Sequence, residues 1–218
     1  MYQFPGGQWK APTTDDLVYA VGMKTNSARL LKQYACLFFV AALIMGASVP
    51  LLNAQWEEGK DVPYVPTPPD VVAGMLKLAG VKSGDFVIDL GCGDGRIVVM
   101  AAQKFGARAK GVDFNPTRIE EAQQNARQAG VTNQVQFVQW DFFEADIHEA
   151  TVVTLYLLPD INLKLRPNLL KELKVGSRIV SHSFDMGEWE PDKTEKINGR
   201  TIRLWTVTEK AKATYARK

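Results

Sequence analysis

The sequence has few of the residues from which metal sites and disulfides are built. Among its 218 residues are two cysteines and two histidines. Cys36 lies in an apolar segment and Cys92 in a glycine-rich turn, so we predict neither a disulfide nor a metal site. The net charge is only +2, which gives no electrostatic argument for binding nucleic acid. We therefore expect no nucleic-acid partner.

Two phosphate-binding signatures are also missing from the main glycine-rich stretch, residues 86–96. A dinucleotide fingerprint needs its third glycine at position 96, where this chain has an arginine. No Gly-Lys-Ser or Gly-Lys-Thr follows, which excludes a phosphate-binding loop of that type. A dinucleotide-dependent oxidoreductase is therefore a remote alternative.

The same stretch contains an acidic residue and three glycines at alternate positions. It begins as a short apolar run, typical of a strand buried on both faces, and an apolar helical segment follows it. Strand, glycine turn and helix open a nucleotide-binding βαβ unit. A carboxylate at the strand end repels a pyrophosphate but attracts an amine, such as that of S-adenosylmethionine. We predict that this ligand binds at Asp89, Gly91, Gly93 and Gly95. A glycine-rich turn without any ligand is the alternative.

A second carboxylate, Asp113, ends the next predicted strand, residues 109–113. It follows Gly93 by about the distance at which an acid binds a ribose diol in such folds. A carboxylate accepts hydrogen bonds from both hydroxyls, so we assign Asp113 to the ribose. A helix-capping or solvated aspartate is the alternative.

A third acid, Asp141, follows the predicted strand 135–140. It stands at the tip of the third consecutive strand that ends in an acid, and we predict that it accepts from the adenine amino group. Phe142 or Trp140 then supplies an apolar wall for the adenine ring. An ordinary core role for each aromatic side chain is the alternative.

The remaining pattern predicts alternating strands and helices that end in a hairpin across Gly199. A helix over 161–173 contains Pro167, and we expect it to be kinked or split there. His182 lies near the end of a predicted strand, where we weigh a structural role against a functional one. The other predicted helices cover 69–79, 96–104 and 116–129, and the other strands cover 151–157, 177–182, 193–198 and 201–207.

The chain divides into five regions by composition. We predict a polar and basic N-terminal region, an apolar segment, a proline-rich linker, the catalytic domain and a frayed basic tail. These regions cover residues 1–33, 34–54, 55–69, 70–208 and 209–218. The prolines of the linker make it stiff and extended, and it either acts as a spacer or lies over the ligand and presents Tyr64.

The apolar segment 34–54 carries no charge and follows a basic stretch. These features are typical of a secretory signal or a short membrane anchor, with a buried soluble helix as a third reading. We therefore predict export to the periplasm or membrane association through 34–54, although the supply of S-adenosylmethionine favours the cytoplasm. Read from Met23, the signal is well formed. We hypothesise that translation starts there and that residues 1–22 come from a miscalled start codon.

The motifs between Val62 and Thr208 resemble the class I S-adenosylmethionine-dependent methyltransferases. Pro63-Tyr64-Val65-Pro66, followed by the glycine turn, is similar to the mitochondrial protein-lysine methyltransferases that act on ATP synthase subunit c and on the adenine nucleotide translocase, and to bacterial relatives. The resemblance implies an α/β fold: a Rossmann-like seven-stranded methyltransferase sheet with an antiparallel C-terminal hairpin, preceded by an apolar N-terminal segment.

The resemblance also implies a function, namely methyl transfer from S-adenosylmethionine to a protein lysine. It assigns Tyr64 the catalytic, substrate-side role, and Tyr156 and Asp160 are further candidates to orient the amine. The Asn/Asp-Pro-Pro-Tyr/Phe motif of many amino-group methyltransferases is replaced here by an apolar loop, Thr154 to Pro159. Two alternatives stay open: a methyltransferase for a small molecule or lipid headgroup, and a non-catalytic module that binds the cofactor.

Overall fold

The structure is a computed structural model that describes residues 64–216. The predictions for residues 1–63 lie outside this range: the apolar segment 34–54, the start at Met23 and most of the linker. Export or membrane attachment therefore stays a prediction. Within residues 64–216, no helix is both long and apolar enough to cross a membrane.

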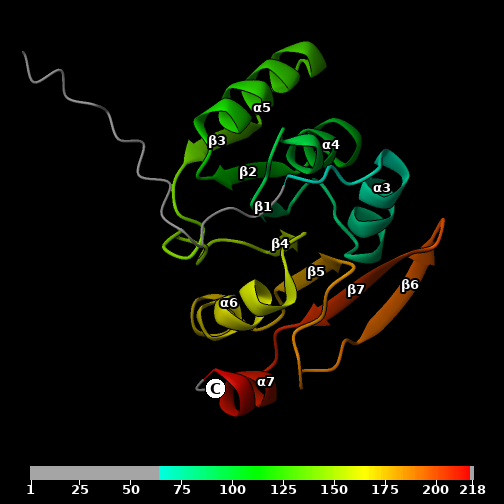
Figure 1. The fold of residues 1–218 in the computed structure, drawn as a ribbon, viewed down its shortest axis with the longest axis vertical. Coiled ribbons are helices and arrows are strands. Elements are labelled where there is room, and N and C mark those ends of the chain that lie inside the picture. The colour runs from blue at the N-terminus through cyan, green and yellow to red at the C-terminus, as the bar shows by residue number, and fades with distance from the viewer. Residues whose placement is uncertain (1–63, 217–218) are drawn as a thin grey trace, which may run out of the picture. The chain divides into compact units, whose positions relative to one another are not determined.

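A seven-stranded sheet forms the centre of the domain, in the order β3-β2-β1-β4-β5-β7-β6. The first five strands pair in parallel, and β7 runs antiparallel to both of its neighbours. This confirms the predicted α/β sheet with its antiparallel C-terminal hairpin (Figure 1). The strands are β1 (Phe86–Leu90), β2 (Arg108–Asp113), β3 (Val135–Gln139), β4 (Val152–Leu155), β5 (Arg178–His182), β6 (Lys193–Ile197) and β7 (Arg200–Thr206).

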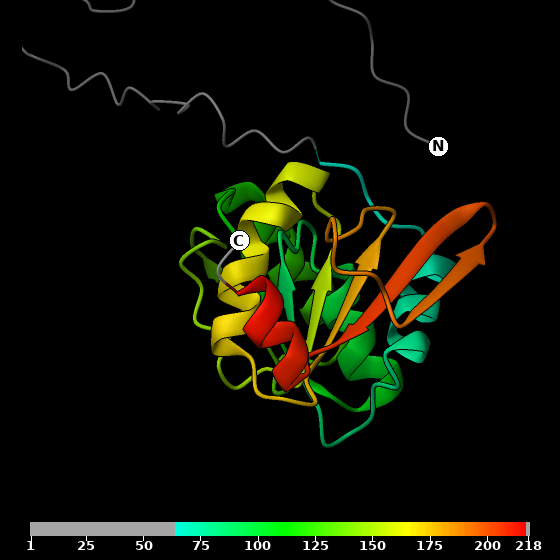
Figure 2. The same ribbon diagram turned by 90° about the horizontal axis from the view of Figure 1, so that it is seen from below.

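Helices cover both faces of the sheet. Figures 1 and 2 show α6 and α7 on one face and α3, α4 and α5 on the other. Ile88 and Leu90 pack toward α6, whereas Val87 packs toward α3 and α4. Because β1 is buried on both faces, its sequence is an almost continuous apolar run. The helices are α3 (Pro69–Leu78), α4 (Arg96–Phe105), α5 (Pro116–Ala129), α6 (Pro159–Glu172) and α7 (Glu209–Tyr215).

Local chemistry sets the helix ends as the sequence predicts. At the start of α5, the Asn115 side chain accepts a hydrogen bond from the backbone N–H of Thr117 at 2.9 Å, and Pro116 takes the first helical position. Gly130 ends the same helix with a φ of 70°. Helix α6 runs as one element through Pro167, so a split at that residue is wrong.

The predicted frayed tail is also wrong, because the chain after Thr208 forms α7. The Thr208 hydroxyl accepts a hydrogen bond from the backbone N–H of Ala211 at 3.1 Å, which caps the helix. Ala211 is buried in the core, and the ring of Tyr215 stacks on Trp189 with their centroids 6.2 Å apart. This packing against the sheet layer stabilises a helix that is too short to form alone.

We predict that Thr208→Ala lowers the free energy of unfolding by about 1 kcal/mol, because it removes the helix cap. Thr214→Ala in the same helix is the matched control. It removes only the exposed hydrogen bond from Thr214 to the Lys210 carbonyl, and we expect a change within about 0.5 kcal/mol. Urea unfolding measures both values. Equal effects of the two substitutions would contradict the capping role.

Candidate active site

A cavity opens at the carboxyl ends of β1, β2 and β4, and its open space is about 720 Å³. Because β1 lies between β2 and β4, the strand order reverses there, which is where open α/β sheets bind ligands. Seven of the predicted site residues line this cavity, namely Tyr64, Asp89, Gly91, Gly93, Asp113, Phe142 and Tyr156.

The glycine turn brings its backbone up to the cavity. The N–H groups of Gly91 and Cys92 both donate to the Val112 carbonyl, which ties the turn to the end of β2. Gly93 has a φ of 52°, and a Cβ there would lie 2.5 Å from the Tyr64 ring. A side chain at this position would therefore be strained and would also displace the tyrosine.

Gly95 is the one predicted glycine that does not line the cavity. It caps α4 with a φ of 74°, and a Cβ there would lie 2.6 Å from the Phe137 ring and 2.7 Å from the Ala122 Cβ. The absence of a side chain at Gly95 therefore allows the close packing of α4 against the neighbouring strand and helix.

Asp113 connects the glycine turn to the start of α5. Its Oδ2 accepts a hydrogen bond from the Gly93 N–H at 2.8 Å, and its Oδ1 accepts one from the Asn115 N–H at 2.9 Å. The carboxylate is 7% exposed and lines the cavity. Each oxygen of an ionised carboxylate accepts more than one hydrogen bond, so both retain acceptor capacity for a ligand hydroxyl.

Asp89 is a buried carboxylate that is 2% exposed and lines the cavity. The Thr154 hydroxyl donates to its Oδ1 at 2.6 Å, and no ion pair within residues 64–216 neutralises it. Burial raises the pKa of Asp89 to about 7, helped by the charges of Asp113 and Asp94 and opposed by the Thr154 hydrogen bond. The site therefore favours a cation beside this carboxylate.

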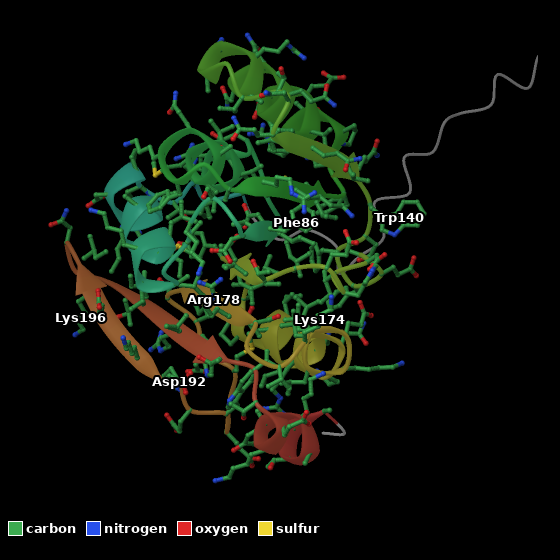
Figure 3. All side chains as sticks on the ribbon, turned by 180° about the vertical axis from the view of Figure 1, so that it is seen from behind. Phe86, Trp140, Lys174, Arg178, Asp192 and Lys196 are labelled. Atoms are coloured by element: carbon green, nitrogen blue, oxygen red, sulfur yellow. The ribbon has the colours of Figure 1, made fainter. Side chains whose placement is uncertain are left out.

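The structure does not bring Asp141 to the other site residues. Asp141 does not line the cavity, and its Oδ1 accepts a hydrogen bond from the backbone N–H of Phe143 at 2.9 Å. Of the two predicted apolar walls, Phe142 lines the cavity and is buried. Trp140 is 53% exposed and lies at the rim of the domain (Figure 3).

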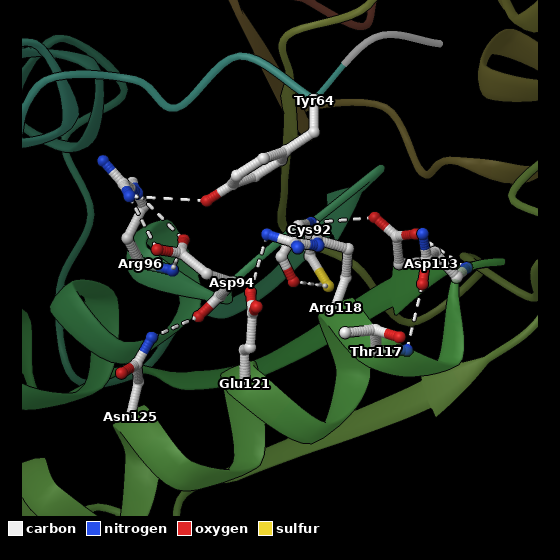
Figure 4. A network of polar contacts seen from close by, with 11 residues as sticks. Tyr64, Cys92, Asp94, Arg96, Asp113, Thr117, Arg118, Glu121 and Asn125 are labelled. Atoms are coloured by element: carbon white, nitrogen blue, oxygen red, sulfur yellow. Dashed lines mark hydrogen bonds and ion pairs between the residues drawn. The ribbon is translucent and has the colours of Figure 1, made fainter. Parts of the chain in front are cut away.

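The segment Tyr64–Pro68, here called the strap, crosses the glycine turn. The Arg118 guanidinium lies 4.3 Å from the centre of the Tyr64 ring (Figure 4). Arg96 donates to the Thr67 carbonyl at 2.9 Å. Burial and the nearby Asp94 carboxylate raise the pKa of the Tyr64 hydroxyl, so it stays protonated at neutral pH. The sequence predicts that the linker is either a spacer or a segment that lies over the ligand. Its described part, the strap, lies over the cavity.

Arg96 is held in place by a two-pronged ion pair with Asp94. Its Nε donates to Oδ1 at 2.9 Å, and its Nη2 donates to Oδ2 at 2.6 Å. The Asp94 carbonyl in turn accepts from the Asn125 side chain of α5 at 2.9 Å. The arginine that replaces the third glycine of a dinucleotide fingerprint therefore supports the strap.

His182 and Tyr156 lie together at the ends of β5 and β4. Their ring centroids are 3.9 Å apart, and the Nδ1 of His182 forms a hydrogen bond with the Thr67 hydroxyl at 3.1 Å. The imidazole is fully buried, which lowers its pKa to about 4 with a smaller contribution from the charge of Arg200. His182 is therefore neutral at pH 7.

Comparison with known proteins identifies the family. The family model described as the ANTKMT methyltransferase domain matches residues 89–193. A protein-lysine N-methyltransferase from Saccharolobus islandicus is 48% identical, and the match covers 68% of this chain and 95% of that protein. The chain belongs to the ANTKMT methyltransferase family.

This methyltransferase is also similar to other proteins with stated acceptors. A solved structure described as an RNA methyltransferase from Salinibacter ruber, in complex with S-adenosyl-L-homocysteine, is 54% identical with a TM-score of 0.66, covering 66% of this chain and 95% of that one. The adenine nucleotide translocase lysine N-methyltransferase of Mus musculus is 34% identical over 66% of this chain and 62% of its own length. The resemblance predicted from the sequence is thereby confirmed.

Sequence reasoning missed several residues of the methyltransferase site. Thr154 of β4 donates a hydrogen bond to Asp89, and the Arg118 guanidinium of α5 lies over the Tyr64 ring. Both positions depend on how these elements pack. Arg96 could have been chosen as a site residue from the sequence, because it directly follows the glycine turn and begins α4. Asn115 caps α5, and it also lines the cavity.

We predict that Asp89→Asn stabilises the methyltransferase above pH 7. The pKa of Asp89 is about 7 in the folded chain, against 3.8 as its ordinary value, so the folded state holds this proton longer and loses stability as the pH rises between these values. Asparagine keeps an acceptor for Thr154 and removes the charge. The gain has an upper bound of about 4 kcal/mol at pH 8 and shrinks toward pH 5. Denaturant unfolding at several pH values measures it.

Asp85→Asn is the control with the opposite sign. Burial raises the pKa of Asp85, but hydrogen bonds from Thr151 and the Lys82 N–H and the charge of Arg178 outweigh burial and lower it. Its carboxylate therefore stabilises the fold at neutral pH, and the asparagine variant is expected to be less stable. A lower free energy of unfolding for Asp89→Asn than for the unchanged protein at pH 8 would contradict the prediction.

Proposed function

We propose that this protein transfers a methyl group from S-adenosylmethionine to the side-chain amine of a lysine in another protein. The observation that carries the proposal is Asp89, a buried carboxylate without a cationic partner among residues 64–216, beside a glycine turn that only small residues fit. The S. islandicus relative named as a protein-lysine N-methyltransferase supports a lysine acceptor.

The residues of the cavity fit S-adenosylmethionine by their chemistry. Asp89 suits the amine of the methionine part, and Asp113 suits the ribose diol as a double acceptor. Phe142 offers an apolar surface for the adenine ring. Gly91 and Gly93 allow the backbone to approach the ligand closely. We keep Asp141, which directly precedes Phe142, as a proposed partner of the adenine amino group.

When bound, S-adenosylmethionine supplies a methyl group that its sulfonium already activates. The chain's own task is then to position a neutral amine and to exclude water. Leu157 and Tyr156 line the β4 side of the cavity, and Val65 lines the strap side. These largely apolar surroundings lower the pKa of a lysine that enters, which favours the neutral amine. The Tyr64 hydroxyl is protonated and serves to orient groups rather than as a base.

RNA is the second candidate acceptor, because the Salinibacter ruber structure is described as an RNA methyltransferase. The low net charge of this chain argues against it. A small molecule or lipid headgroup as acceptor, or cofactor binding without turnover, are the remaining alternatives. The candidate acceptors predict different labelled products, and cofactor binding without turnover predicts none. One labelling experiment therefore separates these alternatives.

We predict that Asp113→Ala weakens binding of S-adenosylhomocysteine by about ten- to a hundredfold, because it removes the ribose acceptor and frees the Gly93 N–H. Isothermal titration calorimetry on the full chain measures the dissociation constant. Asp146→Ala is the control, since this exposed aspartate bonds to the nearby His148 and does not line the cavity. A change of less than threefold in the Asp113 variant would remove the ribose assignment.

The acceptor is tested with S-adenosylmethionine that carries a labelled methyl group. We expect label in protein when the enzyme is given a protein extract, and mass spectrometry should locate it on lysine. Parallel reactions receive total RNA, or the low-mass and lipid fractions. The Asp113→Ala variant supplies the background of each reaction. Label in RNA or in lipid alone would replace the lysine proposal, and cofactor binding without label in any fraction would favour the non-catalytic module.

A further inference from the structure

His182 is a fully buried polar residue that the cofactor site does not use. Val180, two residues earlier on the same strand face, is an apolar core residue, so the strand itself does not require an imidazole at position 182. Its Nδ1 bonds to Thr67 of the strap, and its Nε2 has no hydrogen-bond partner within residues 64–216. A buried polar atom without a partner is unfavourable, which calls for a reason why histidine occupies this position.

The imidazole contacts two residues that line the cavity, Thr67 through a hydrogen bond and Tyr156 through its ring. The two rings lie 3.9 Å apart with 30° between their planes, and Phe184 lies beyond Tyr156 at 6.2 Å with nearly parallel planes. Tyr156 lines the cavity, whereas His182 does not. The histidine therefore acts on the cavity by fixing the position of the tyrosine.

Tyr156 stands on the side of the cavity that faces away from the proposed ribose and adenine positions. Tyr156 follows the end of β4, which lies beside β1 on the opposite side from β2. Asp113 and Phe142 come from the other side of β1, at the ends of β2 and β3. The part of the cavity beside Tyr156 is thus left for the acceptor.

We propose that His182 is a positioning residue for methyl transfer, which fixes Tyr156 at the acceptor side of the cavity and joins it through Thr67 to the strap. This inference rests on the proposed function, because it assumes that an amine acceptor approaches Tyr156. An amine or ammonium group binds favourably against an aromatic ring, and the ring must be held still to orient it. A neutral imidazole behind the ring adds no charge that repels the cation.

The same contacts connect two parts of the site that are far apart in sequence. Thr67 offers its hydroxyl to His182 and its carbonyl to Arg96, which also pairs with Asp94 of the glycine turn. Thr67 therefore connects the strap over the cofactor site, through His182, to the Tyr156 ring on the acceptor side. Loss of the Thr67–His182 hydrogen bond should loosen the tyrosine without removing any group proposed to bind the cofactor.

The kinetic test uses His182→Phe, which keeps a ring but loses both nitrogens, and Thr67→Val, which removes the hydroxyl from the other side. We expect each variant to lower kcat/KM for the lysine acceptor at least tenfold while the affinity for S-adenosylhomocysteine stays within threefold. The double variant should be no worse than either single variant, because both remove the same hydrogen bond. His182→Asn, which restores a polar group near Thr67, should recover part of the activity.

Thr151→Val is the matched structural control. It removes hydrogen bonds to Asp85 and Phe86 at the opposite end of the sheet, so it should lower stability but keep kcat/KM within twofold. Loss of activity in this control equal to that in Thr67→Val would show a general effect of reduced stability and would overturn the proposal.

A measurement without turnover keeps the inference separate from the proposed function. Nuclear magnetic resonance of the chain with ¹³C-labelled tyrosine rings, assigned with Tyr156→Phe, reports the environment of this ring. We expect its signals to shift in both His182→Phe and Thr67→Val but not in Thr151→Val. Unchanged Tyr156 signals would overturn the positioning role. Shifted signals in a protein that methylates no acceptor would support the positioning of the ring and would end the proposed function instead.

Discussion

The hydrogen bond from the Gly93 N–H to the Asp113 carboxylate holds the site together. It joins the glycine turn after β1 to the end of β2, across 20 residues of chain, at 2.8 Å. The same carboxylate accepts from Asn115, so the start of α5 is fixed by the same group. Since Arg118 of that helix lies against the Tyr64 ring, the position of the strap depends on this bond as well.

Asp89 shows the conflict between stability and binding in this site. A carboxylate with a pKa near 7 is unfavourable for the folded chain at neutral pH, yet a ligand amine turns the same charge into a favourable contact. This conflict is the reason why Asp89→Asn is predicted to increase the free energy of unfolding. Stability alone would favour a neutral side chain at position 89. Thr154, which pairs with Asp89 on β4, is such a neutral residue.

The sequence predicted the parts of the site that follow from local rules, namely the glycine turn, Asp89 before it and Asp113 at the next strand end. It did not predict Thr154, because its contact with Asp89 depends on the β1–β4 register. It placed Asp141 with the other acids, but the direction of that side chain depends on the turn 140–143, where it bonds to a local backbone N–H. The fold followed from strand and helix patterns, while α7 depends on tertiary packing.

The two sides of the cavity differ in how they are held. Backbone turns and carboxylates fix the side proposed for the cofactor, and their geometry is set by short-range hydrogen bonds. The side proposed for the acceptor is formed by aromatic and apolar side chains from β4, β5 and the strap, which only tertiary contacts position. A change of acceptor therefore requires changes only in the second group.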